Sequence, residues 1–150
     1  MQRNLYGGDE QYGAFVQAII DGKMSVANQL LAAGMDINAL NDRGWTPLHF
    51  AIENMQLEGA KFLLDNGANP NRGDLAGLTP LHIAIDAEQD YGTQVYVKTG
   101  EHPPSADLTT LLLEHGADPN AKTNTGRTPL SVAKHHPKAV DILKRHGARE

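Results

Sequence analysis

The seven histidines are the side chains best suited to metal binding or acid–base catalysis near neutral pH. His49 and His82 each stand three residues after a threonine, where an imidazole can partner a helix-capping hydroxyl. His135 and His136 are adjacent, and adjacent helical residues do not share a face. We therefore predict no metal site, and we interpret this pair as an exposed turn before Pro137.

Nucleophilic and phosphate chemistry also lacks a supporting pattern. Ser25, Ser105 and Ser131 stand in no strand–turn–helix elbow. The glycine-bearing run 73–77 does not match a phosphate-binding loop and is interpreted as a turn. The chain has no cysteine, which excludes disulfides, thiolate metal sites and thiol nucleophiles. We expect no catalytic residues and no cofactor.

The composition fits one compact domain or a short array of repeated units, with 150 residues of which 40% are apolar. A pI near 5.7 and a net charge of −5 argue against a nucleic-acid partner. No stretch approaches the roughly 20 apolar residues of a membrane span. The first eight residues lack the apolar core of a signal peptide. We expect a cytoplasmic protein without membrane contact.

An internal repeat organises the sequence. Thr46–His49 recurs as Thr79–His82, and it returns in a weaker form, after a longer interval, as Thr128–Ser131. Gly67–Asn71 recurs as Gly116–Asn120 after the same longer interval. The two markers agree on a period of about 33 residues, interrupted once by an insertion of about 16 residues.

This pattern resembles the ankyrin repeat, which has the same period and the same Thr-Pro-Leu-His motif. The resemblance covers residues 10–148 and implies an all-α solenoid of stacked helix–turn–helix units with hairpin-like links. We place a tail at 1–9 and a repeat domain at 10–150. The units are 10–41, 42–74, 75–123 with an insertion at 88–104, and 124–150.

Residue types within a unit explain its helices. Thr46 can cap a helix with its hydroxyl, Pro47 suits the first helical position, and Gly67 suits a left-handed C-cap. Helical spacing predicts which apolar residues face the core. These are Phe15, Ala18, Ile19, Val26, Leu30, Leu31, Leu48, Ala51, Ile52, Leu57, Ala60, Leu63, Leu64, Val140, Ile142 and Leu143.

The resemblance implies a binding face, because partners of ankyrin repeats usually meet the concave surface of hairpin tips and first helices. The tip candidates are Leu40, Asp42, Arg43, Trp45, Leu75, Leu78, Asn124 and Arg127, and the helix candidates are Glu53, Asn54, Asp86 and His135.

Trp45 is the only tryptophan, and we expect its tip to be exposed as a binding hot spot. The alternative is that this large residue packs across neighbouring hairpins. Leu75 and Leu78 are apolar residues at predicted loop tips, which favours contact with a partner.

The insertion is the most individual feature of the chain. Its run Thr93–Thr99 alternates between β-prone residues and predicts an extended segment, with the second helix restarting near Ser105. Tyr91 and Tyr96 are candidate contacts with a partner. A mobile linker is the competing interpretation.

Charge is unevenly distributed, with a net −3 over 1–73, −7 over 74–118 and +5 over 119–150. Acidic blocks speed the encounter with basic partners, although a solvated surface explains them equally well. We hypothesise a non-enzymatic module that binds another protein, with a monomer favoured over a homo-oligomer. The alternative is a dedicated inhibitor or immunity-type antitoxin protein that neutralises a toxin or an enzyme.

Overall fold

The computed structural model describes the backbone of residues 6–99 and 105–150, and the side chains of these residues except 92–99. The described residues contain helices and no strand. The helices are α1 (Glu10–Ile20), α2 (Met24–Ala32), α3 (Pro47–Glu53), α4 (Leu57–Asp65), α5 (Pro80–Thr99), α6 (Asp107–Glu114), α7 (Pro129–Val132), the 3-10 turn η1 (Ala133–His135) and α8 (Pro137–Arg145).

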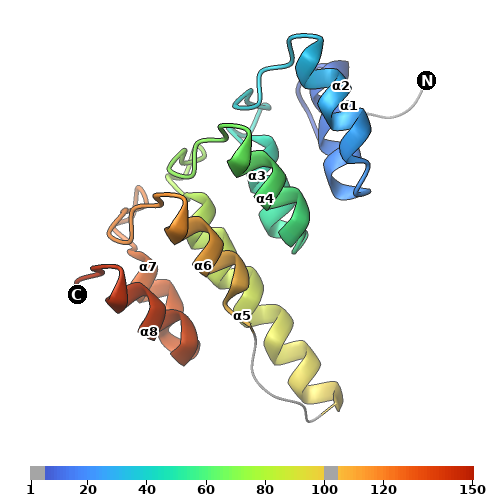
Figure 1. The fold of residues 1–150 in the computed structure, drawn as a ribbon. Coiled ribbons are helices and arrows are strands. Elements are labelled where there is room, and N and C mark those ends of the chain that lie inside the picture. The colour runs from blue at the N-terminus through green and yellow to red at the C-terminus, as the bar shows by residue number, and fades with distance from the viewer. Residues whose placement is uncertain (1–5, 100–104) are drawn as a thin grey trace.

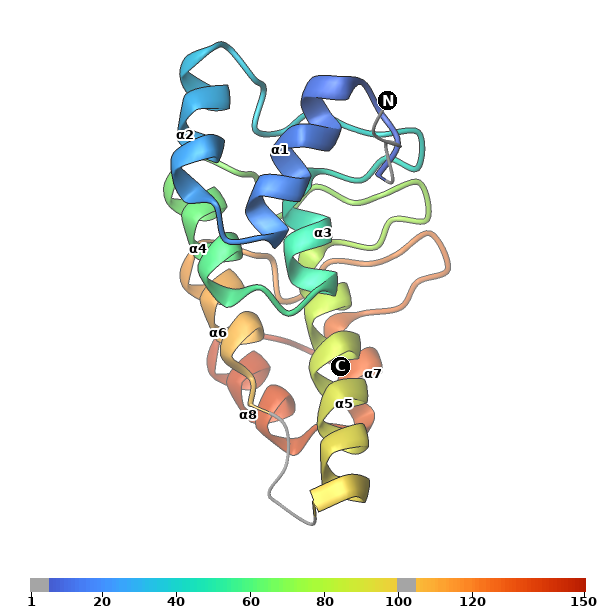
Figure 2. The ribbon, with the colours of Figure 1, turned by 90° about the vertical axis from the view of Figure 1, so that its right-hand side faces the viewer.

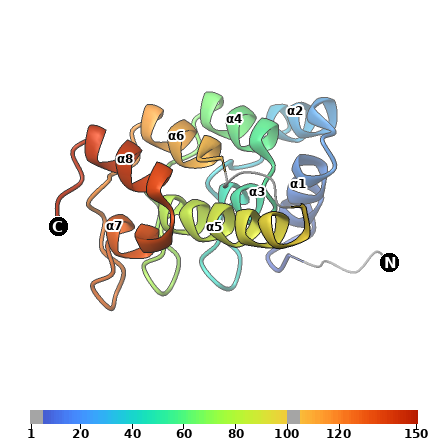
Figure 3. The ribbon, with the colours of Figure 1, turned by 90° about the horizontal axis from the view of Figure 1, so that it is seen from below.

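The helices form two rows that follow the chain from one end of the stack to the other (Figure 1). Helices α1, α3, α5 and α7 make the inner row, and α2, α4, α6 and α8 make the outer row (Figure 3). Three hairpin-shaped links project from the inner row on the side away from the outer helices (Figures 2 and 3). The predicted all-α solenoid of helix pairs is confirmed.

The core lies between the two rows. Phe15, Leu48, Ile52, Leu81 and Leu112 are fully buried within one continuous cluster. Alanine recurs where helices approach closely, since Ala51, Ala84 and Ala133 have no exposed surface. Stacking therefore buries the apolar face that no single unit could bury alone.

Two of the predicted core residues are exposed. Val26 is 39% exposed and lies on α2, the helix at one end of the described outer row, where no other described helix covers its outward side. Leu57 is 38% exposed because it lies in the first turn of α4, at the edge of a groove toward α6. The predicted burial of these two side chains is wrong.

The histidines of the repeat cap the inner helices, as predicted. The amide of Thr46 donates to Nδ1 of His49 at 3.0 Å, and the Thr46 hydroxyl lies 2.8 Å from the same nitrogen. Because Nδ1 accepts from an amide, the ring proton resides on Nε2, which faces the carbonyl of Leu78 at 3.4 Å. His82 repeats this arrangement and reaches the carbonyl of Arg127 at 3.1 Å. Each imidazole thus caps its own helix and contacts the next unit.

Asparagines join the links between units in a ladder. Asn38 accepts a hydrogen bond from the amide of Asn69 at 2.8 Å, and Asn71 accepts one from the amide of Asp118 at 2.7 Å. Asn120 accepts from the amide of Arg149 at 2.8 Å. Each side-chain amide also donates to the carbonyl of a glycine in the following unit. The repeat period therefore places one inter-unit clamp at every step.

The insertion lengthens a helix rather than forming an extended segment. Helix α5 has 20 residues and continues to Thr99, so the predicted β-like conformation of Thr93–Thr99 is wrong. Extending an existing helix requires no new nucleation, which outweighs the modest β propensity of threonine, valine and tyrosine. In Figures 1 and 2 this helix reaches well past the ends of α3 and α7. Residues 100–104 of the predicted insertion lie outside the described residues.

A buried carboxylate from α5 caps the helix that follows the insertion. Ala106, at the N-cap of α6, offers no side-chain hydrogen bond. Glu88 has no exposed surface, and its Oε1 accepts from the amide of Leu108 at 2.6 Å. Its Oε2 accepts from the hydroxyl of Thr109 at 2.6 Å. Burial raises the pKa of Glu88 to about 7, although these hydrogen bonds oppose the shift.

Candidate functional site

The three hairpin tips are joined into one row by backbone hydrogen bonds. The amide of Leu75 donates to the carbonyl of Arg43 at 3.4 Å, and the amide of Asn124 donates to the carbonyl of Ala76 at 3.0 Å. The Asn124 side chain donates to the carbonyl of Leu75 at 2.9 Å. The tips are therefore held relative to one another rather than moving as separate loops.

Trp45 is buried, with 9% of its surface exposed, so the expected exposure of this residue is wrong. Its ring stacks on His49, with centroids 5.7 Å apart, and meets Phe50 edge-on at 4.9 Å. The indole Nε1 donates to a carboxylate oxygen of Asp74 at 3.1 Å, on the next hairpin. The alternative interpretation, packing across neighbouring hairpins, is confirmed. An indole that packs between two neighbouring hairpins buries a large apolar area, and its N–H group finds a hydrogen-bond acceptor.

Arg43 covers this aromatic cluster. Its guanidinium carbon lies 4.6 Å from the centroid of the Trp45 ring and 5.8 Å from that of Phe50. Tyr6 also meets Phe50 edge-on at 5.1 Å, and its hydroxyl donates to Gln17 at 2.7 Å. The described start of the chain thus packs on α1 and α3, and the exposed guanidinium is held by cation–π contact.

The other candidate residues differ in exposure. Leu75 is 73% exposed and Leu40 is 41% exposed, whereas Leu78 is half-buried. The side chain of Tyr96 lies outside the described residues. The exposed polar and aromatic candidates are Asp42, Arg43, Glu53, Asn54, Asp86, Tyr91, Asn124, Arg127 and His135.

The histidine pair is split between surface and interior. His135 is exposed, but His136 is buried, so the prediction of an exposed pair is wrong for His136. Nδ1 of His136 accepts from the amide of Ala139 at 3.5 Å and caps α8, which begins at Pro137. Burial lowers the pKa of His136. Across the described residues, no group of three or more side chains could hold a metal ion.

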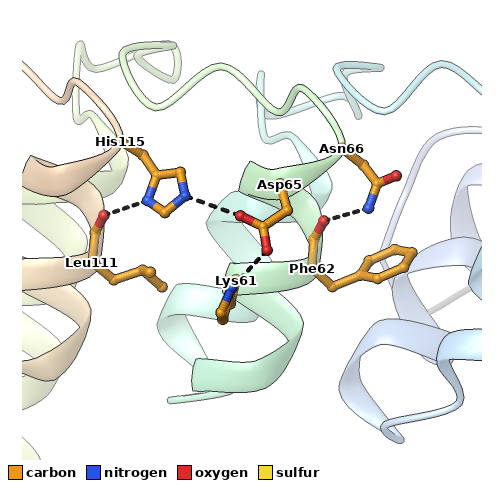
Figure 4. Close-up of polar contacts among 6 residues, drawn as sticks. All are labelled: Lys61, Phe62, Asp65, Asn66, Leu111 and His115. Atoms are coloured by element: carbon orange, nitrogen blue, oxygen red, sulfur yellow. Dashed lines mark hydrogen bonds and ion pairs between the residues drawn. The ribbon is translucent and has the colours of Figure 1, made fainter.

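The outer face carries an ion-pair network between α4 and α6 (Figure 4). Asp65 accepts from Lys61 at 2.7 Å and lies 3.1 Å from Nε2 of His115. Hydrogen bonds from Lys61 and then from His115 lower the pKa of Asp65. The other ring nitrogen of His115 lies 2.9 Å from the carbonyl of Leu111, so both ring nitrogens have partners. This network links the two outer helices α4 and α6.

A groove of about 240 Å³ lies beside this network on the outer face. It is lined by Leu57, Glu58, Lys61, Asp107, Thr110, Leu111 and Glu114. None of these residues was among the sequence candidates for binding, because the groove forms between two helices that are distant in the chain and lie side by side only in the stack.

The capped helix pairs, joined hairpins and asparagine clamps are those of ankyrin repeats, and family models agree. A model of three ankyrin repeat copies matches residues 15–99, and a single ankyrin repeat model matches residues 76–124. The chain belongs to the ankyrin repeat family.

Relatives extend this assignment. The chain is 31% identical over 142 residues, 93% of its length, to "Ankyrin repeat, SAM and basic leucine zipper domain-containing protein 1" of Dasypus novemcinctus. It is 36% identical over 61 residues to the Mus musculus protein of the same name, and 37% identical over 62 residues to the "2-5A-dependent ribonuclease" of Mus musculus. The chain spans only 27%, 13% and 8% of these three proteins, respectively.

Ankyrin repeats generally mediate protein–protein interaction and are generally not catalytic. In the part of the chain that the structure describes, no helix is both long enough and apolar enough to cross a membrane.

Proposed function

We propose that this chain is a protein-binding module whose partner contacts the row of hairpin tips and the exposed side of the inner helices. The observation that carries the proposal is the middle tip, where Leu75 projects an apolar side chain that is 73% exposed. The conformation of a turn does not require leucine at such a position. An exposed apolar side chain lowers the solubility of a protein, so its presence here favours contact with a partner.

The neighbouring tips support Leu75 as a contact. A Cβ atom at Gly44 would lie 3.3 Å from Cγ of Leu75, so the leucine rests directly on the backbone of the preceding hairpin. Arg43, on that same hairpin, is held over the Trp45 ring. Arginine and exposed apolar side chains on a rigid support lose little entropy on binding, which favours affinity.

The length of the candidate face favours a complex of standard size. A standard interface buries about 800 Å² on each partner, contributed by some 20–30 residues. The tips and inner helices of four units span the whole length of the stack (Figure 2). The long helix α5 also carries the candidate Tyr91, which is 58% exposed.

The test compares two exposed apolar residues on opposite faces. We expect Leu75→Asp to lower the affinity for the natural partner by about 2 kcal/mol, which is the threshold of a hot spot. Val26→Asp, on the outer helix α2, is the matched control and leaves affinity unchanged. The partner is first captured from native extract with the wild type, and its affinity for each variant is then measured by calorimetry. Equal affinities of both variants would refute the assignment of the binding face.

A second variant tests the insertion. Replacing residues 92–104 with a short Gly-Ser link retains Glu88 and therefore the cap of α6. We expect weaker binding of the same partner if the end of α5 contributes to the interface. Unchanged affinity would show that the partner contacts only the hairpin tips and the inner helices before residue 92.

Mixing the purified partner with the chain separates an adaptor from an inhibitor. Loss of the partner's own activity on binding supports the inhibitor or antitoxin hypothesis, and retained activity supports an adaptor. The monomeric state and the cytoplasmic location remain predictions, which light scattering and cell fractionation test directly.

A further inference from the structure

The exposed residues of the inner helices are sorted by charge along the stack. In α3 the exposed residue is Glu53, and in α5 as far as residue 90 the exposed residues are Asp86 and Asp90. In α7 and η1, one unit further on, exposed Lys134 and His135 follow Ser131. The inner face is therefore acidic over the second and third units and basic over the fourth.

None of these charged side chains forms an ion pair with another side chain in the described part of the chain. The ion pairs found there join Lys61 to Asp65, His115 to Asp65 and Arg145 to Asp141, all on outer helices.

The electrostatic environment of Asp86 shows the effect of leaving these carboxylates without an ion-pair partner. Asp86 is exposed at its surface but loses part of its hydration to neighbouring groups, and this partial desolvation raises its pKa; the charge of Arg127 opposes that shift, and the charge of Asp90 adds to it. A cationic group brought to this face would therefore stabilise a carboxylate that the protein itself leaves poorly compensated.

The spacing of the acidic residues follows the repeat. Glu53 and Asp86 are one repeat period apart and occupy equivalent positions on the neighbouring inner helices α3 and α5. Packed helices lie about 8–10 Å apart. An extended or polyproline II chain advances about 3.1–3.4 Å per residue, so about three of its residues span one unit.

We propose that the inner face binds an extended segment of a partner protein with basic residues at every third position and an acidic residue beyond them. One basic residue lies over Glu53 and the next lies over Asp86, and the acidic residue lies over Lys134. Asp90 lies about one helical turn from Asp86 on the same helix and adds negative charge beside the second basic residue. This inference rests on the proposed function and specifies the chemistry of the partner.

The probes are labelled synthetic peptides of identical composition. In the first, arginines occur at every third position among glycine and serine, followed by two glutamates; in the second, the arginines are consecutive. Fluorescence anisotropy with the full chain at low salt measures both affinities. Two exposed ion pairs formed in register predict about fivefold tighter binding of the first peptide. Equal affinities, or tighter binding of the second peptide, would overturn the proposal.

Two triple variants with the same change of net charge show which face of the protein causes the preference for the first peptide. Glu53→Gln with Asp86→Asn and Asp90→Asn is expected to abolish the preference for the first peptide. Glu58→Gln with Asp107→Asn and Glu114→Gln neutralises exposed carboxylates of the outer helices and is expected to retain it. Loss of the preference in the outer-face variant alone, or in both variants equally, would contradict binding at the inner face.

Lys134→Gln tests the change from an acidic to a basic inner face at the fourth unit. This variant is expected to bind the peptide with glutamates and a peptide with serines in their place equally well, whereas the wild type prefers the glutamates. If the natural partner still binds the inner-face triple variant but not Leu75→Asp, the proposed function stands and the charge-based inference fails.

Discussion

At the scale of single residues, Glu88 illustrates how a side chain distant in sequence can supply a missing cap. Helix α6 begins after the insertion, without a serine, threonine, aspartate or asparagine at its N-cap. The Glu88 carboxylate accepts hydrogen bonds from the amide of Leu108 and from Thr109 instead. A negative charge at this position also suits the helix dipole, which partly offsets its burial.

This burial predicts a pH dependence of stability. Because the pKa of Glu88 rises from 4.5 to about 7, the folded protein keeps a proton that the unfolded chain has lost. The contribution of protonated Glu88 to the free energy of unfolding is therefore fully present below pH 4.5. This contribution is lost as the pH rises toward about 7. Glu88→Gln cannot ionise, so its free energy of unfolding relative to the wild type should increase across this window. Urea unfolding at both ends of the window measures the difference.

The control variant is Glu58→Gln, which alters an exposed glutamate of α4. Burial lowers the pKa of His49, His82 and His136, so these residues contribute stability that is lost as the pH falls below 6.5. The wild type, Glu88→Gln and Glu58→Gln all contain these histidines, so the histidine contribution cancels when the stability of a variant is compared with that of the wild type. A relative stability of Glu88→Gln that stays constant with pH would contradict the burial of an ionisable group here.

At the scale of elements, the hairpin links act as packed structures. Gly77 has a φ of +77°, and a Cβ atom there would lie 2.7 Å from Oδ1 and 2.8 Å from the amide nitrogen of Asn124. Gly126 is the equivalent residue of the last hairpin, with a φ of +80° and nothing within 4 Å of a Cβ atom. The two glycines share a backbone conformation and differ only in having a neighbouring hairpin.

This pair permits a matched test of hairpin packing. Both Gly77→Ala and Gly126→Ala carry the cost of a left-handed alanine, about 1 kcal/mol. We expect Gly77→Ala to lose a further 1–3 kcal/mol or so, because the methyl group overlaps the next hairpin. Urea unfolding of the two variants gives the comparison, and equal losses would show that the tips do not depend on close contact.

The asparagine ladder is the second device that joins units. Asn71 accepts from the amide of Asp118 and donates to the carbonyl of Gly116. Removing both bonds in Asn71→Ala should lower the free energy of unfolding by about 1–2 kcal/mol. Asn28→Ala, at an exposed position of α2, serves as the comparison in the same unfolding assay. A loss no larger than that of Asn28→Ala would mean that the ladder adds no stability.

At the scale of the whole molecule, stability comes from interfaces between neighbouring units. Leu81 and Ile85 of α5 are fully buried, and α5 packs against α3, α6 and α7. A solenoid of this kind has no contacts between distant units, so each interface must hold its own neighbours.

The whole-molecule prediction follows from this dependence. Leu81→Ala should cost about 2–5 kcal/mol, because it opens a cavity at the centre of the stack. Leu75→Ala, at the exposed middle tip, should change stability by less than about 0.5 kcal/mol. Urea unfolding followed by circular dichroism measures both. A similar loss in the two variants would contradict the division between a stabilising core and a binding surface.

The sequence by itself determined the repeat and most of its local structure. The period of the repeat, the capping of α3 by Thr46 and His49, and the left-handed Gly67 with a φ of +96° were all predictable. These local features depend on residues within a few positions of one another, and the preferences of threonine, proline and glycine act at that range.

Only the tertiary structure decided the course of 93–99, the burial of Trp45 and His136, and the partner of Glu88. The indole is buried because the next hairpin along the stack supplies Asp74. Glu88 is buried because α6, which follows the insertion, packs beside α5. Such outcomes depend on which surfaces meet when the units stack, and local preferences of the chain carry no information about contacts between distant residues.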